Sequence, residues 1–461
     1  MGSASSVSSL PPDFSPITKT DDSAGLIPKQ LKGNTMSLLD NIKAHVSDES
    51  ISGLVFEVDY EPLSGPATPV APPTYAPKEK GGPAQHAFTP EAFVPEPADG
   101  GWYSGLQRNQ DSTPRLASRI VLNSVQAQAG RAELAAWRCQ DRLGLRLPGI
   151  IVDGRPAAET AKDPQLADAL RRSFSTWELA HRQNDAWIKF ATTDDKRLVW
   201  QQDVGTIEGT ADASRVKSLI AAASAERADL LYRYFPNAAI FGFWVSSGVA
   251  ARHRLARAFS SEIVGLGAHP VASGATKLDP TGGAINTTGV TVNSDNSLTV
   301  KATSTKQTRP SLAGFGQIPA QPGTRSFLCE FILEQGSVSL QLLRSLRYPN
   351  QEQSVTATTV LTLLSLAGHA LATEDGFLRS GCALVPVDER WGWRRRGQRT
   401  PEALPVATLA EIAEALHEAI LEAEGVGLSF AEPITLQFSG PELEIIGQRV
   451  ASDAKTLISE E

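Results

Sequence analysis

The sequence is poor in the residues and patterns that mark secreted, membrane-spanning or metal-dependent proteins. Only three cysteines occur in 461 residues, and no CxxC pair is present, so neither a disulfide framework nor a zinc ribbon is indicated. The N-terminus has no positive region followed by an apolar core, and no run approaches 18 apolar residues. We therefore expect a cytoplasmic protein with no metal, no cofactor and no membrane contact.

The motifs of common catalytic sites are also missing. No GxxxxGK[ST] phosphate loop and no GxSxG elbow occur. His417 and Glu418 begin an HExxH pattern, but Leu421 stands where the second histidine would be needed. The seven histidines are otherwise scattered along the chain. We assign no catalytic residue and expect a binding protein, not an enzyme.

Composition divides the chain into regions. Residues 1–35 are rich in Ser, Pro, Thr and Asp without periodicity, which predicts a disordered tail. A Pro/Gly-rich loop is expected over residues 61–115, because such composition disfavours helices and central strands. Residues 54–60 alternate as in a strand, and residues 407–424 form a strongly amphipathic pattern with acidic residues on the polar face. The mixed order of elements predicts an α+β fold and not a doubly wound parallel sheet.

Positive charge is concentrated in one place in a chain whose formal net charge is −8. Arg252, His253, Arg254 and Arg257 lie within six positions, shortly after the apolar run at residues 238–245. We expect a strand over that run and a short helix ending at Gly265, so that the cations face a polyanion. The alternative is a solvated helix face beside a core strand.

A second candidate site lies at a predicted strand-to-helix junction. Arg119 precedes it, and Gln126, Gln128 and Arg131 follow in a segment of helix-forming composition. Amides and arginines at a helix start hold phosphates through their side chains and through free backbone N–H groups. An ordinary polar helix face is the alternative.

Two further segments combine cations with aromatic residues or glycine. The first contains Lys301, Lys306 and Arg309 and then Phe315 between two glycines, which suits stacking on a base. Its alternative is a mobile loop. The second, residues 391–396 (WGWRRR), suits single-stranded nucleic acid and a subunit interface equally well.

These segments occur in an order that resembles the large RAMP-type backbone subunit of type I-G (formerly I-U) CRISPR effector complexes, a crRNA-binding relative of the "Cas seven" subunits. The similarity covers about residues 36–440. The family's first helix usually reads close to SVQSQANR, whereas this chain has Ala127 and Gly130 at two of those positions. The matching segments are SRIVLNSVQAQAGRAE (118–133), YFPNAAIFGFWVSSG (234–248), ARAFSSEIVG (256–265), RPSLAGFGQIP (309–319) and GFLRSGCAL (376–384).

The resemblance implies an RRM-like (ferredoxin-like) palm within one domain, residues 36–461. It implies a finger-like helical insertion at 140–230 and a thumb-like hairpin region at 266–325, and it adds Arg379 to the RNA-binding candidates. Such subunits polymerise along guide crRNA and present it for pairing with target DNA. The implied partners are crRNA, target DNA through the guide, further copies of the chain, other Cascade subunits and a helicase-nuclease.

Two other functions remain open from the sequence. A metal-independent endoribonuclease of the same superfamily would need a histidine or a tyrosine–lysine set at the scissile ribose, and His253 is the only histidine inside a basic cluster. A structural assembly protein would bind no nucleic acid. RNA that co-purifies with the chain would separate the nucleic-acid functions from the last one.

Overall fold

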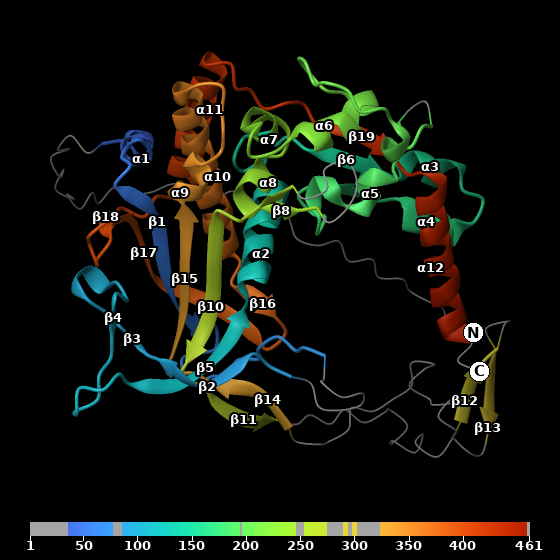
Figure 1. The fold of residues 1–461 in the computed structure, drawn as a ribbon. Helices are drawn as coiled ribbons and strands as arrows, with labels where there is room; N and C mark the ends of the chain where they lie inside the picture. The colour runs from blue at the N-terminus through green and yellow to red at the C-terminus, as the bar shows by residue number, and fades with distance from the viewer. Residues whose placement is uncertain are drawn as a thin grey trace, which may run out of the picture. The chain divides into compact units, whose positions relative to one another are not determined.

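A computed structural model of the chain describes residues 36–76, 85–193, 196–245, 253–273, 289–293, 297–301 and 323–458. Met1–Ser37 and Leu38–Glu461 form separate units, and the elements below belong to the second unit. That unit combines a large antiparallel sheet with several helices (Figure 1). The predicted α+β class is therefore confirmed.

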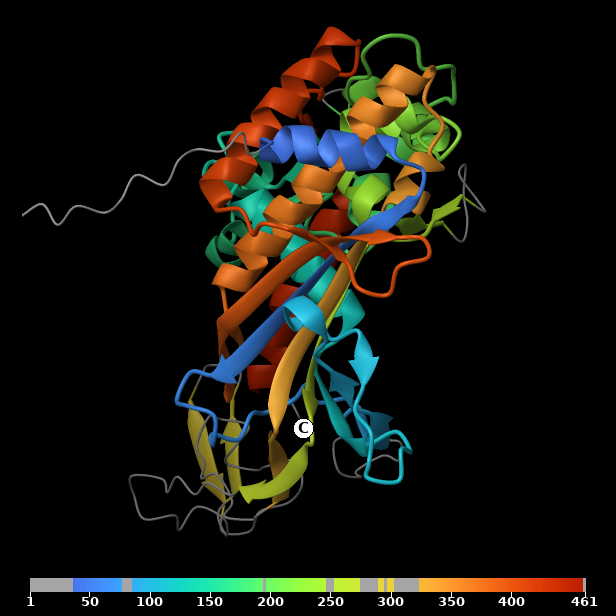
Figure 2. The same ribbon diagram turned by 90° about the vertical axis from the view of Figure 1, so that its left-hand side faces the viewer.

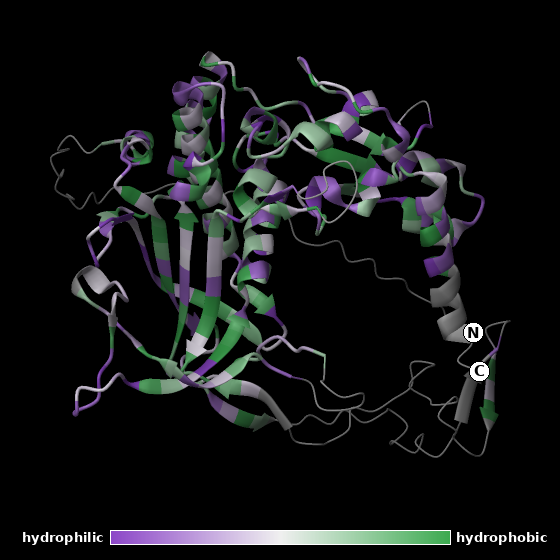
Figure 3. Cartoon of the chain, viewed as in Figure 1, coloured by the Kyte–Doolittle hydropathy of each residue, from purple (hydrophilic) through white to green (hydrophobic). Residues whose placement is uncertain are grey.

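The large sheet has eight strands in the order β16–β17–β1–β15–β10–β5–β2, with β18 paired to β17, and every pairing is antiparallel. Residues of both hydropathy classes recur along these strands in Figure 3, as expected when the two faces of a sheet meet different surroundings. The strands are β1 (Ile51–Pro62), β2 (Phe88–Phe93), β5 (Leu116–Asn123), β10 (Phe259–Leu266), β15 (Phe331–Ser339), β16 (Phe377–Arg379), β17 (Cys382–Arg395) and β18 (Glu402–Leu404).

Four of these strands have the connectivity of a ferredoxin-like unit. In chain order they are β1, β10, β15 and β17, and in the sheet they lie as β17–β1–β15–β10. Helix α2 (Val125–Arg138) lies in the connection from β1 to β10, and α10 (Gln351–Glu374) in the connection from β15 to β17. This is a βαββαβ pattern with long insertions. The sheet is thus compatible with the expected RRM-like palm.

Helices cover one face of the sheet (Figure 2). Phe56 points from β1 toward them, stacks on Phe259 and contacts His369 of α10. By length and composition α10 could cross a membrane, but 83% of its most apolar window is buried inside the fold, as in the core helix of a globular domain. The remaining helices of this layer are α1 (Leu38–Ser47), α9 (Leu340–Arg344) and α11 (Leu409–Gly425).

Residues 140–230, predicted as a helical insertion, also contain strands. β6 pairs in parallel with β19 and antiparallel with β7, which makes a second, three-stranded sheet. The elements of this region and its C-terminal partners are β6 (Ile150–Asp153), α3 (Arg155–Thr160), α4 (Pro164–Leu170), β7 (Ser173–Ser175), η2 (Arg182–Asn184), α5 (Ala186–Lys189), η3 (Val199–Gln201), η4 (Ala213–Arg215), α6 (Val216–Ala222), α7 (Ala228–Tyr234), β19 (Ile434–Gln437) and α12 (Gly440–Ile458).

Short hairpins occupy two other predicted regions. The loop expected at 61–115 contributes edge strand β2 and the pair β3 (Pro95–Glu96) with β4 (Gly105–Leu106), joined through η1 (Asp99–Gly101). In the region 266–325, β11 (His269–Ser273) pairs with β14 (Gly323–Leu328), and β12 (Gly289–Val292) pairs with β13 (Leu298–Lys301). The region in which the resemblance implies a hairpin thus contains paired antiparallel strands, and its role as a thumb stays a prediction.

The expectation for residues 238–265 is wrong for the helix, and for the strand it holds only at β8 (Phe243–Trp244). The apolar run begins as a helix, α8 (Pro236–Phe241), which ends at Gly242. The segment expected to end as a helix at Gly265 is instead β10. Every residue of α8 is buried, and an apolar run that is buried on all sides does not distinguish a helix from a strand.

Candidate nucleic-acid interface

The predicted site at the start of α2 forms, but most of its side chains bind other parts of the fold. Arg119 on β5 is paired with Glu262 on the neighbouring strand β10. Arg131 donates hydrogen bonds to the carbonyls of Ala372 (3.0 Å) and Asp375, at the C-terminal end of α10. Gln126 remains exposed in the first turn of α2. Only Gln126 is therefore fully available to a ligand.

Gln128 was predicted to contact RNA, but its side chain is 1% exposed and belongs to a buried polar cluster. Its Nε2 donates to the carboxylate of Glu334 at 2.9 Å. The same carboxylate accepts hydrogen bonds from Tyr60 (2.8 Å) and from Ser261. A buried carboxylate needs such donors, because desolvation of an unbonded charge is costly. Gln128 thus stabilises the contact between α2 and the sheet and has no surface for RNA.

Arg379 lies on β16 and, like Arg131, is bonded to another part of the fold. Its guanidinium donates to the carbonyl of Ala71 at 3.3 Å. Burial raises the pKa of the Cys382 thiol to about 11, and Arg379 and Arg131 both oppose this rise. Both arginines therefore lie near Cys382 of β17, and both make internal hydrogen bonds.

The described residues of the cluster, 253–257, include one strand of a two-stranded ribbon. β8 (Phe243–Trp244) pairs with β9 (Arg254–Leu255), and the partners are Phe243 with Leu255 and Trp244 with Arg254. We call residues 242–245 and 253–258 the basic ribbon. Phe243 and Leu255 are buried, whereas the side chains of Trp244 and Arg254 are exposed. Because successive side chains of a strand point to opposite faces, the outer face of the ribbon presents a tryptophan beside an arginine.

Gly242 fixes the entry of the chain into the basic ribbon. Its φ is 75°, in the region that favours glycine. A Cβ atom at this position would lie 2.5 Å from the carbonyl oxygen of Leu255. The carbonyl of Gly242 accepts a hydrogen bond of 2.8 Å from Arg182, whose guanidinium also pairs with the buried Glu133 of α2. The ribbon is therefore tied to the helical layer of the palm.

The side chains of Arg254 and Arg257 differ from those of Arg119, Arg131 and Arg379 in making no hydrogen bond or ion pair within the described part of the chain. Among the described residues no carboxylate pairs with Arg254 or Arg257. Nη1 of Arg257 and Nδ1 of His253 are buried and make no hydrogen bond within the described part of the chain. Residues 234–261 contain no Asp or Glu at all. A polyanion could therefore pair with these cations without displacing an existing ion pair.

Several predicted residues lie outside the described residues: Arg252, Lys306, Arg309 and Phe315. The backbone of Lys301 lies at the end of β13, opposite Gly289. The proposed contacts of these five residues with RNA stay predictions.

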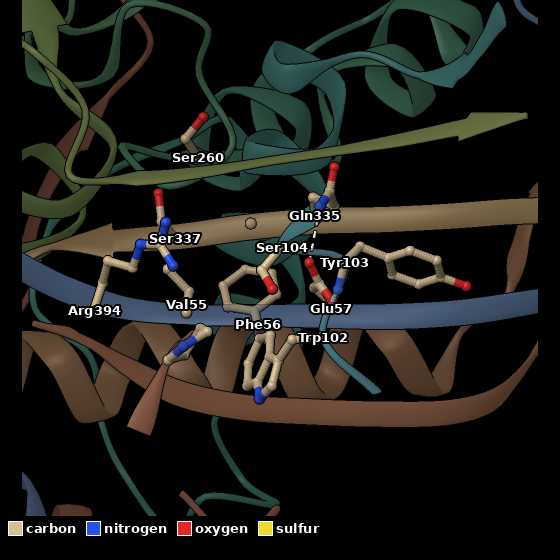
Figure 4. A pocket seen from close by; sticks show the side chains of 12 residues that line it. Val55, Phe56, Glu57, Trp102, Tyr103, Ser104, Ser260, Gln335, Ser337 and Arg394 are labelled. Carbon is tan, nitrogen blue, oxygen red and sulfur yellow. Dashed lines mark hydrogen bonds between the residues drawn. The ribbon is translucent and has the colours of Figure 1, made fainter. Parts of the chain in front are cut away.

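The face of the sheet opposite the helices is hollowed over its four central strands (Figure 4). The hollow has a volume of about 360 Å³ and is bounded by the segment that carries Trp102 and Tyr103. The strand side chains that point into it are aliphatic, polar or charged, among them Val55, Glu57 and Ser337. An RRM stacks RNA bases on aromatic side chains of its strands. The described strand side chains at this hollow therefore do not form such an aromatic platform.

Polar groups beside this hollow are largely bonded to one another. Glu57 accepts hydrogen bonds from the backbone N–H of Tyr103 (2.9 Å) and from Gln335 (2.8 Å). Arg390 pairs with Asp59 at 2.8 Å, and its guanidinium lies 5.4 Å from the centre of the Tyr103 ring. Burial, and then the hydrogen bond to Asp59, raises the pKa of Tyr103 to about 12. These contacts hold the segment that carries Trp102 and Tyr103 on the sheet.

The tryptophans of the predicted segment 391–396 are not at the surface. Trp391 and Trp393 are 1% and 0% exposed. Trp393 stacks on His45 with ring centroids 4.6 Å apart, and its Nε1 donates to Asn41 at 2.9 Å. Neither of the two predicted roles, stacking on nucleic acid or forming a subunit interface, is therefore available to these side chains. The exposed tryptophan is Trp244, which no local sequence pattern marks as a surface residue.

No group of three or more His, Cys, Asp or Glu side chains that could hold a metal ion occurs among the described residues.

Comparison with known proteins bears on the part of the chain that includes the basic ribbon. Residues 54–270 match the family model described as CRISPR-associated protein GSU0053. The match supports a CRISPR-associated role for this chain. It begins in β1 and ends in β11, so it covers α2, the basic ribbon and β10. None of the curated proteins matches the sequence. The subtype and the assignment as a backbone subunit stay predictions.

Proposed function

We propose that the chain is a backbone subunit of a CRISPR interference complex of type I-G, which binds guide crRNA through its basic ribbon. The observation that carries the proposal is the presence of Arg254 and Arg257 without acidic partners in a segment of 28 residues that contains no Asp or Glu. The family match over residues 54–270 and the βαββαβ sheet support the same function.

The mode of binding follows from the distribution of charge. Arginine binds phosphate through a planar fork of N–H donors, and its contacts with the backbone of a nucleic acid are independent of sequence. In RNA-guided recognition, base pairing reads the sequence and the protein holds the backbone. Unpaired arginines on an exposed ribbon meet this requirement, whereas Arg119 would first have to break its ion pair with Glu262.

The proposal includes partners and excludes catalysis. The chain would polymerise with further copies along the guide in the cytoplasm and would contact target DNA through the guide. It would also contact other Cascade subunits and a helicase-nuclease. We propose no catalytic residue, metal or cofactor for it.

The salt dependence of guide binding tests the proposal. Replacing Arg252, Arg254 and Arg257 with Ala should weaken binding of a defined crRNA. It should also lower the slope of log affinity against log salt by about two, because each phosphate neutralised on a single strand contributes about 0.7. The measurement is a filter-binding or fluorescence-anisotropy titration at four salt concentrations.

A matched control removes the same charge elsewhere. Arg171, Arg172 and Arg449 are exposed on other parts of the chain, and a variant with Ala at all three should keep the slope of the wild type. An equal loss of slope in both variants would mean that net charge, and not the basic ribbon, governs binding. An unchanged slope in the first variant would refute the proposed site.

A further inference from the structure

Trp244 differs from every other tryptophan of the chain in its exposure. All eight tryptophans lie within the described residues, and the other seven are buried or half-buried. The side chain of Trp244 is 69% exposed. On a structured ribbon beside exposed arginine, the indole offers a flat apolar face to a ligand.

The backbone holds Trp244 outward. Phe243 and Val245, on either side of it, are buried, and alternation along the strand therefore turns the indole away from the core. The N–H of Val245 donates to the carbonyl of His253 at 3.0 Å, which continues the ladder beyond the two-residue strands. Together with the bond from Arg182 to Gly242, this contact limits the freedom of the ribbon. The ring is thus presented before a ligand arrives.

We infer that Trp244 stacks on a base of single-stranded RNA while Arg254, its cross-strand partner, binds an adjacent phosphate. The inference rests on the proposed function and names the contact that the basic ribbon makes. Directly opposite side chains on paired strands have Cβ atoms about 4.5–5.5 Å apart. The base and the phosphate of a nucleotide are joined through one sugar. Two neighbouring side chains can therefore contact both groups at once.

The charge around Trp244 favours a nucleic acid over a protein partner. Tryptophan and arginine are enriched in protein interfaces too. The segment around Trp244 has cations only, however, which complements the uniform negative charge of a phosphate backbone. Base stacking on an aromatic ring is tolerant of sequence, because every base has a π-face. Such a contact suits a subunit that must hold guides of any sequence.

Full-length Trp244→Ala and Trp244→Phe variants test the inference against single-stranded RNA oligonucleotides of two unrelated sequences. We expect Trp244→Ala to weaken binding roughly 5- to 150-fold, which corresponds to the 1–3 kcal/mol of one stacked base. The loss should be equal for both sequences, and Trp244→Phe should retain most of the affinity. Leu421→Ala, which shortens another exposed apolar side chain, should bind as the wild type.

A direct readout is photocrosslinking to an oligonucleotide that contains 5-bromouridine, with the crosslinked residue identified by mass spectrometry. A crosslink at Trp244 supports the inference. If Trp244→Ala binds RNA as well as the wild type, the inference is overturned and the proposed function stands. If the wild type binds neither oligonucleotide, both fall. A Trp244→Ala variant that loses only self-association, measured by light scattering, would assign the residue to a protein interface and overturn the inference.

Discussion

The buried ion pair between Arg182 and Glu133 offers a test of how the basic ribbon is held in place. Arg182 contacts the two carboxylate oxygens of Glu133 at 2.7 and 2.6 Å, and its third nitrogen donates to the carbonyl of Gly242 at 2.8 Å. The side chains of Arg182 and Glu133 are 15% and 6% exposed. Replacing Arg182 with Met removes all three bonds and leaves a buried carboxylate with one remaining side-chain donor, Asn237 (2.9 Å).

The magnitude follows from the burial of the carboxylate. Removing one partner of a buried pair typically costs about 3–5 kcal/mol, because the other charge is left without compensation. Burial already raises the pKa of Glu133, and Arg182 opposes that rise. Without Arg182 the folded state binds the proton of Glu133 more tightly than the wild type does. The penalty in the variant should therefore be larger at pH 8 than at pH 5, where protonation relieves the buried charge.

Urea unfolding followed by circular dichroism at pH 5 and pH 8 measures both effects. The matched control is the double variant Arg182→Met/Glu133→Leu, which removes both charges and should recover most of the lost stability. A loss below about 1 kcal/mol for Arg182→Met would refute the reasoning, since exposed pairs contribute that little. If Arg182→Met/Glu133→Leu were as unstable as Arg182→Met, that result would also refute the reasoning. In the folded protein, Arg182→Met should also weaken guide binding, because Gly242 loses its anchor.

Two further predictions concern residues away from the ribbon. Burial raises the pKa of Glu442 to about 8, so the wild type should lose stability as pH rises from about 4.5 to 8, and Glu442→Gln should gain about 1–3 kcal/mol relative to it at pH 8 in urea unfolding. A constant difference between the two proteins across this range would contradict the assignment. Trp393→Ala should cost about 3–5 kcal/mol and leave the RNA affinity of the folded protein unchanged, because the ring lies in the core. Lost affinity at unchanged stability would restore the surface role predicted for residues 391–396.

The sequence predicts correctly those elements that have one buried face and one polar face, because their hydropathy then varies with the period of a helix or a strand. α11 has a polar face of acidic residues and begins with a capping box from Thr408 to Glu411, and the amphipathic pattern located it. β1 alternates, and its strand was predicted from residues 54–60. α8 could not be located in this way, since its residues are buried on every side and its period is hidden.

The candidate site was only partly predictable, because the sequence shows cations but not their partners. Arg119 finds Glu262, which lies 143 residues away, and Arg131 finds the end of α10, 241 residues away. No local pattern distinguishes these arginines from Arg254. Trp244 was missed for a related reason. It stands in an apolar run that resembles core, and only the pairing of β8 with β9 turns its side chain outward.

The local charge of the ribbon explains how an acidic chain can bind a polyanion. At physiological ionic strength, interactions between exposed charges fade beyond about 8 Å, so the net charge of −8 acts on a phosphate mainly through its nearest residues. Around Trp244 the sequence supplies only cations for 28 residues. On the proposed function, the same screening would limit the reach of the ribbon to the few nucleotides that it contacts. A long guide would therefore require many copies of the chain, each contributing one short contact, and this is the arrangement that a backbone subunit provides.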